Sequence, residues 1–149
     1  MAVYRFRRNE YPICLRCYRG CPYTYAYCNS PSQARLYRHE TGGKYFRKKS
    51  FEVIKKQLIH FKKEEIKAEA FYFWADTLMA YNDKEFEEFV EMYADIKLPL
   101  WCQAFPETIS EDRIRKLMKV GLFRRGSGVE HGNEKFRLQV LKRKVKKTR

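Results

Sequence analysis

The sequence has few of the residues and runs that mark several classes of protein. Of its 149 residues only 7 are glycine and 5 are proline, which excludes collagen-like and low-complexity chains. No apolar run approaches the roughly 18 residues that a membrane span needs, and the basic start from Met1 to Arg8 lacks the apolar core of a secretory signal. We therefore expect no membrane association, a cytoplasmic location and no disulfides.

Basic and apolar residues are abundant. The chain holds 32 Lys+Arg against 18 Asp+Glu, and 44% of its residues are hydrophobic, enough for the core of one globular domain over residues 1–149. The basic tail, residues 142–149, could contact nucleic acid or an acidic partner. Because most such runs are simply solvated, we do not expect nucleic acid as a partner.

Four amphipathic helices are predicted from apolar residues at helical spacing. In the third helix, for example, Ile114, Leu117 and Met118 are predicted to face inward. Each helix has a capping residue at its start. The predicted caps are Ser50, Asp83, Ser110 and Asn133.

Extended, mostly aromatic and apolar segments lie between these helices, so strand and helix alternate. This order predicts an α/β fold with parallel strands and about four βα units. Because a closed eight-unit barrel takes ~200 or more residues, we expect a partial barrel, either a fragment or a chain whose partner completes the sheet. The predicted strands lie within residues 11–19, 66–74, 99–105 and 122–130.

One connection is far longer than the others. About thirty residues, 20–49, separate the first strand from its helix, where ~2–6 are ordinary. Long loops at the carboxyl ends of parallel strands carry much of the chemistry of α/β proteins. Four cysteines cluster in or just before this loop, as metal-binding or reactive thiols do in a reducing compartment: Cys14, Cys17, Cys21 and Cys28.

The segment from Arg19 to Cys28, RGCPYTYAYC, resembles the cluster-binding loop of radical S-adenosylmethionine (SAM) enzymes, C-x3-C-x2-C with an aromatic residue before the last cysteine. Cys21 and Cys28 match the outer cysteines and Tyr27 matches the aromatic residue. Tyr25 stands where the middle cysteine is expected.

Four further segments resemble, in order, parts of the subgroup of this family that often carries an N-terminal cobalamin domain. The family's catalytic domain is a partial barrel of six units, so the resemblance implies about four of them here. Cobalamin would come only through a domain absent from this chain. The matching segments are residues 47–54, 73–77, 101–107 and 128–137.

The resemblance implies a 4Fe–4S cluster held by Cys21 and Cys28, with SAM bound to the cluster and an electron donor of the flavodoxin or ferredoxin type. The substrate stays unknown. Phenolate suits a low-potential cluster less well than thiolate, so Tyr25 predicts impaired cluster retention and catalysis. Cys17 or Cys14 could substitute only if the chain bends back toward the loop.

The family resemblance also places three polar residues at the carboxyl ends of strands, where they would bind SAM. These are Asp76, Gln103 and Glu130. Asp76 and Gln103 could equally cap helices or hydrogen-bond at the end of the sheet.

A different class of function is an alternative. The four clustered cysteines could hold zinc in a basic, tyrosine-rich module that contacts RNA through residues such as Arg16, Arg19, Arg35 and Arg38. Only Cys14 and Cys17 have the spacing of a zinc knuckle, so we rank this interpretation second.

Overall fold

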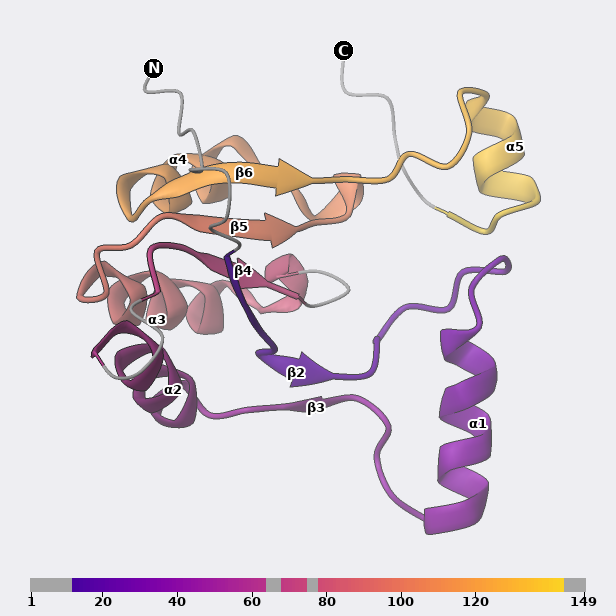
Figure 1. Ribbon diagram of the computed structural model, residues 1–149. Coiled ribbons are helices and arrows are strands. Elements are labelled where there is room, and N and C mark those ends of the chain that lie inside the picture. The colour runs from indigo at the N-terminus through magenta and orange to yellow at the C-terminus, as the bar shows by residue number, and fades with distance from the viewer. Residues whose placement is uncertain (1–11, 64–67, 75–77, 144–149) are drawn as a thin grey trace.

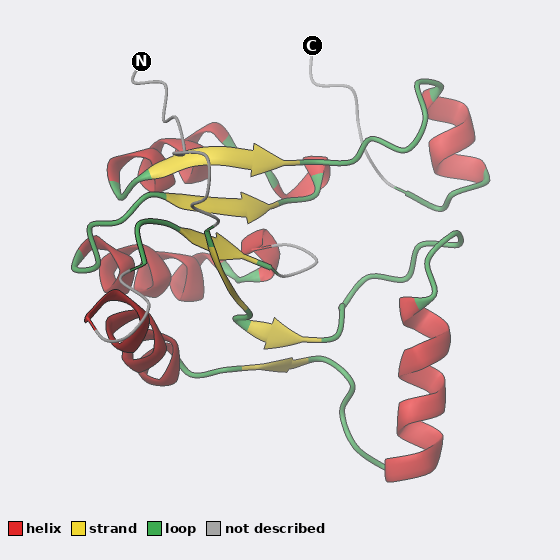
Figure 2. Cartoon of the chain, in the orientation of Figure 1, coloured by secondary structure: helices red, strands yellow, loops and turns green. Residues whose placement is uncertain are grey.

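A computed structural model describes residues 12–63, 68–74 and 78–143. Its centre is a four-stranded sheet in the order β1-β4-β5-β6, in which every neighbouring pair is parallel (Figures 1 and 2). The α/β fold with parallel strands is therefore confirmed, and it is consistent with part of a (β/α) barrel. The strands are β1 (Ile13–Leu15), β4 (Phe71–Phe73), β5 (Leu100–Gln103) and β6 (Leu122–Gly126).

The predicted helices are present between and after these strands. Asn82 caps α3 in a capping box with Glu85, whereas Asp83, the predicted cap, is the first helical residue. The side chains of Ser110 and Asn133 accept hydrogen bonds at the starts of α4 and α5, as predicted. The helices are α2 (Phe51–Lys63), α3 (Asp83–Ala94), α4 (Glu111–Lys119) and α5 (Glu134–Gln139).

The core lies between one face of the sheet and the helices α2, α3 and α4. Phe71, Phe73 and Leu100 point to this face, and Phe89 meets them from α3. The prediction for Met118 is wrong, because this side chain is 60% exposed. Its neighbour Leu117 is fully buried, and consecutive helical residues lie about 100° apart around the axis.

The long connection is more ordered than predicted. It contains α1 (Ser30–Thr41) and β3 (Arg47–Lys48), which pairs antiparallel with β2 (Tyr18–Arg19). The predicted first strand is thus two short strands, β1 and β2. The sequence gives no sign of α1 because none of its residues is buried, so it has no inward apolar stripe.

The carboxyl ends of β4, β5 and β6 all point to one end of the molecule. Figure 1 shows α1 and α5 standing beyond that end, apart from the sheet and its helices. The loop that leads into α1 approaches the segment that follows α5 there. In the described parts of the chain, no helix is long and apolar enough to cross a membrane.

Candidate functional site

Three tyrosines of the cluster-type loop form a row of stacked rings. The rings of Tyr23, Tyr25 and Tyr27 lie 5.7 Å apart centre to centre, with interplanar angles of 0° and 3°. Residues at alternate positions of an extended segment share one side, so the Tyr-x-Tyr-x-Tyr pattern produces this row. Phe105, just after β5, packs edge-on against Tyr23 and Tyr25 at 5.0 and 5.5 Å.

A fully buried arginine from the far end of the chain, Arg143, contacts this row of tyrosines. The guanidinium of Arg143 lies 5.3 Å from the centre of the Tyr25 ring. It donates hydrogen bonds to Glu107 (3.2 Å), Glu130 (2.9 Å) and the Tyr27 hydroxyl (3.1 Å). Two carboxylates therefore balance the buried cation. We call Tyr25, Tyr27, Glu107, Glu130 and Arg143 the Arg143 network.

Hydrogen bonds fix the protonation states within the Arg143 network. The Tyr25 hydroxyl donates to Glu107 at 2.5 Å, and burial together with this bond raises the pKa of Tyr25. Burial alone would raise the pKa of Glu107, but the bonds from Tyr25, the backbone and Arg143 outweigh it and lower that pKa. Tyr25 is thus a neutral phenol that donates its proton to a carboxylate, and not a phenolate ready to bind metal.

The backbone also ties the two ends of the chain together at this site. Ala26 N–H donates to the carbonyl of Leu141 (3.2 Å), and Arg143 N–H donates to the carbonyl of Arg137 (2.8 Å). Glu130 has a φ of 68°, in the left-handed region that residues other than glycine rarely adopt. Its ion pair with Arg143 is a contact that holds this strained conformation.

The predicted thiol ligands are spread over different parts of the fold. Cys28 is exposed, and its sulfur accepts a hydrogen bond from Ser30 N–H at 3.4 Å, while Cys21 is half-buried in the loop. Cys17 is fully buried in the core, where burial raises the pKa of its thiol to about 12. Cys14 is exposed on β1. The structure therefore does not bring Cys17 or Cys14 to the loop as a substitute ligand.

These positions can be tested against the metal centres that the sequence suggested. In the described ranges, no three or more His, Cys, Asp or Glu side chains come together in a way that could hold a metal ion. The four cysteines of the alternative zinc site are not gathered. The side chains present also do not fit a 4Fe–4S cluster with three protein ligands, because Tyr25 is engaged with Glu107.

The predicted SAM-binding residues also differ in their surroundings. Glu130 belongs to the Arg143 network. Gln103 instead donates to the Tyr72 hydroxyl at 2.8 Å, and a Cβ on Gly126 would lie 2.5 Å from its side-chain oxygen. Asp76 lies outside the described residues.

The two residues that organise the Arg143 network, Glu107 and Arg143, were not predicted from the sequence. Glu107 lies shortly after the end of β5. An acidic residue near the end of a strand is a feature by which a sequence can point to a functional site. Arg143 has no such signal, because it is one of many basic residues in the tail, and basic tails are usually solvated.

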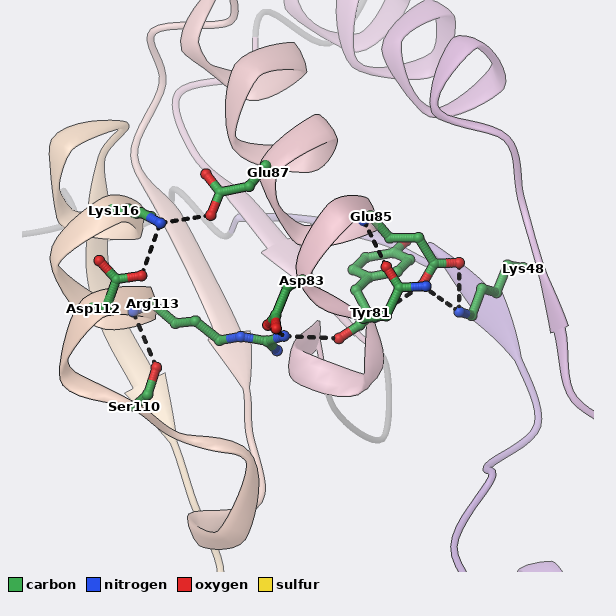
Figure 3. Close-up of polar contacts among 10 residues, drawn as sticks. Lys48, Tyr81, Asp83, Glu85, Glu87, Ser110, Asp112, Arg113 and Lys116 are labelled. Carbon is green, nitrogen blue, oxygen red and sulfur yellow. Dashed lines mark hydrogen bonds and ion pairs between the residues drawn. The ribbon is translucent and has the colours of Figure 1, made fainter.

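A cavity of about 500 Å³ lies near the starts of α3 and α4. Figure 3 shows the charged side chains at these helix starts and the contacts between them. Arg113 donates to Asp83 at 2.6 Å and to the carbonyl of Tyr81 at 3.1 Å. Nearby, Lys116 pairs with Glu87 at 2.6 Å. These cations already have anionic partners, so this cavity offers a ligand little unbalanced charge.

Comparison with known proteins indicates one family. A family model described as the radical SAM superfamily matches residues 12–149. No curated protein matches the chain.

Proposed function

Because the chain belongs to the radical SAM superfamily, we propose that it is a radical SAM protein impaired in binding the family's iron–sulfur cluster. Cys21 and Cys28 are its remaining cluster ligands, and Tyr25 occupies the third position. The observation that carries this proposal is the hydrogen bond from the Tyr25 hydroxyl to Glu107. A phenol that is buried in this bond must break it and lose its proton before it can bind iron.

The number of available ligands decides how well the loop can hold a cluster. In this family three thiolates hold three irons of a 4Fe–4S cluster, and the fourth iron binds SAM. When bound, that pair supplies a radical that abstracts hydrogen from a substrate. Two thiols and a neutral phenol make a weaker set, so we expect the scaffold to persist while cluster retention and radical chemistry are reduced.

The remaining cofactor and partner assignments belong to the same proposal. SAM would bind weakly in the absence of an intact cluster. An electron donor of the flavodoxin or ferredoxin type would act only on a chain that holds the cluster. Membership of the cobalamin-associated subgroup rests on the sequence resemblance alone.

Anaerobic reconstitution with iron and sulfide tests this proposal. We expect the wild-type chain to hold markedly fewer than the four irons of a full cluster, whereas Tyr25→Cys gains iron, sulfide and a broad visible absorption. Tyr25→Phe is the matched control, because it removes the bond to Glu107 without adding a thiol, and its iron content should stay low.

A full cluster in the wild-type chain that responds to SAM would contradict the proposal. Cys14→Ala and Cys17→Ala would then identify the reason. If both variants keep the cluster, Tyr25 is not a defect. If Cys17→Ala loses it, Cys17 has left the core to serve as the third ligand.

A further inference from the structure

Tyr25 and Glu107 form a phenol–carboxylate pair that is shielded from solvent. The Tyr25 hydroxyl donates a hydrogen bond to a Glu107 oxygen at 2.5 Å, a length typical of a bond between a hydroxyl and an ionised carboxylate. Tyr25 is 8% exposed and the side chain of Glu107 is 16% exposed, so water has little access to either group. This bond therefore gives the Tyr25 proton a direct route to a base.

The charge of Arg143 determines how this pair can lose an electron. Its guanidinium lies 5.3 Å from the centre of the Tyr25 ring. If the ring lost an electron and kept its proton, it would become a cation beside another cation, and Coulomb repulsion disfavours that state. If the proton moves to Glu107 at the same time, the oxidised ring is neutral, and Arg143 keeps Glu130 as its anionic partner at 2.9 Å. Electron loss from Tyr25 is therefore favoured only together with transfer of its proton.

Tyr27, the next ring of the row, has a different environment. Its hydroxyl accepts a hydrogen bond from Arg143 at 3.1 Å, and a guanidinium is a donor that cannot take up a proton. Its ring is 43% exposed and is stacked on the Tyr25 ring, with the two centres 5.7 Å apart. Because the faces of the two rings are in contact, an electron from buried Tyr25 can reach an oxidant in solution through Tyr27.

From these observations we propose that Tyr25 is a redox-active residue, which gives up one electron through the Tyr27 ring and passes its proton to Glu107. The protein thereby holds an oxidising equivalent on a buried side chain. The proposal goes beyond the proposed function, because the step needs no iron–sulfur cluster. Iron content and radical formation are separate measurements, so either proposal can fail without the other.

The electron and the proton go to different acceptors. The oxidant is a one-electron metal-complex oxidant of the ruthenium(III) polypyridyl class, and the electron reduces it to ruthenium(II). The phenol O–H bond of Tyr25 breaks, and its proton forms a new O–H bond on the Glu107 carboxylate. The products are a neutral phenoxyl radical at Tyr25, a neutral carboxylic acid at Glu107 and the ruthenium(II) complex.

The test is flash photolysis of the iron-free chain, in which a ruthenium(II) polypyridyl complex and a sacrificial electron acceptor generate the oxidant. We expect the visible absorption and electron paramagnetic resonance signal of a long-lived phenoxyl radical, and Tyr25→Phe should lose it. Glu107→Gln should slow its formation about a hundredfold, the low end of what a positioned base contributes to proton transfer. The wild-type chain should also form the radical more slowly in D2O than in water, a measurement that needs no substitution.

Two control variants separate Tyr25 from the other tyrosines. Tyr93 is fully buried, but its hydroxyl donates to the carbonyl of Leu98 at 3.0 Å, which is not a base, so Tyr93→Phe should keep the long-lived signal. Tyr27→Phe retains the stacked ring without its hydroxyl and should keep the signal as well. The proposal fails if the signal persists in Tyr25→Phe or is lost in either control. It also fails if Glu107→Gln or D2O leaves the rate of radical formation unchanged.

Discussion

Two regions of the molecule are held together by different forces. The layered part is the parallel sheet with α2, α3 and α4. The strand-end region is the Arg143 network with the segments that carry it. Between the sheet and α2, α3 and α4, buried rings and aliphatic side chains pack in many small contacts. Beyond the strand ends, one buried cation joins two carboxylates and two phenols. The layered part therefore resists unfolding through its area of contact, whereas the strand-end region depends on a single residue, Arg143.

The largest expected loss of stability comes from a substitution that creates a cavity in the layered part. Phe89 is fully buried and its ring contacts those of Phe73 (5.3 Å) and Tyr93 (5.9 Å). Phe89→Ala should lower the free energy of unfolding by about 4 kcal/mol, measured by urea denaturation. The control is Val53→Ala on α2, where the side chain is 45% exposed, with an expected change within about 0.5 kcal/mol. Equal losses of unfolding free energy in Phe89→Ala and Val53→Ala would contradict the conclusion that buried apolar packing stabilises the layered part.

A smaller and more local effect is expected at Arg143. Arg143→Met leaves Glu107 and Glu130 without their buried cation, which should cost about 2 kcal/mol of unfolding free energy. Hydrogen exchange gives the sharper measurement. The amide of Ala26, bonded to Leu141, should exchange much faster, while that of Phe71, bonded to Pro99 within the layered part, should not.

Exposed Arg125 supplies the control for this prediction. Arg125→Met should leave both amides unchanged, since no side-chain contact of Arg125 reaches the Arg143 network among the described residues. If the Ala26 amide keeps its protection in Arg143→Met, the strand-end region does not depend on Arg143 and the comparison is wrong.

The smallest expected effect depends on pH. Tyr25→Phe removes one hydrogen bond to Glu107 and should cost about 1 kcal/mol at neutral pH. Because the folded-state pKa of Glu107 is lowered from 4.5, its contribution is present above that value and is lost as the pH falls through the lower folded value. The difference in stability between the wild-type chain and Tyr25→Phe should therefore shrink below pH 4.5. A difference that stays constant down to pH 3 would mean that Glu107 is not the acceptor.

Much of the layered part could be predicted from the sequence, because its signals are local. Apolar residues at helical spacing and caps such as Ser110 and Asn133 lie within a few residues of what they specify. The helix α1 was missed because it buries no side chain and so leaves no periodic pattern. The two strands of the small sheet, β2 and β3, are too short to show alternation.

The candidate site was predictable only in part. The loop and Tyr25 follow from the resemblance to a family motif, and Glu130 was selected from the same source. Their connection was not predictable, because it runs through Arg143, whose buried position depends on contacts far along the chain. No local pattern distinguishes this arginine from its basic neighbours in residues 142–149.

The bond between Tyr27 and Arg143 joins residues 116 positions apart, whereas the strands of the sheet follow one another in chain order from β1 to β6. As the chain is synthesised, the sheet can therefore grow by adding each new strand to the last. The contacts between the tyrosine row and Arg143 cannot form until almost all of the described chain is available. Contacts of such long sequence separation form slowly, so the early part of the cluster-type loop is among the last segments to reach its final place.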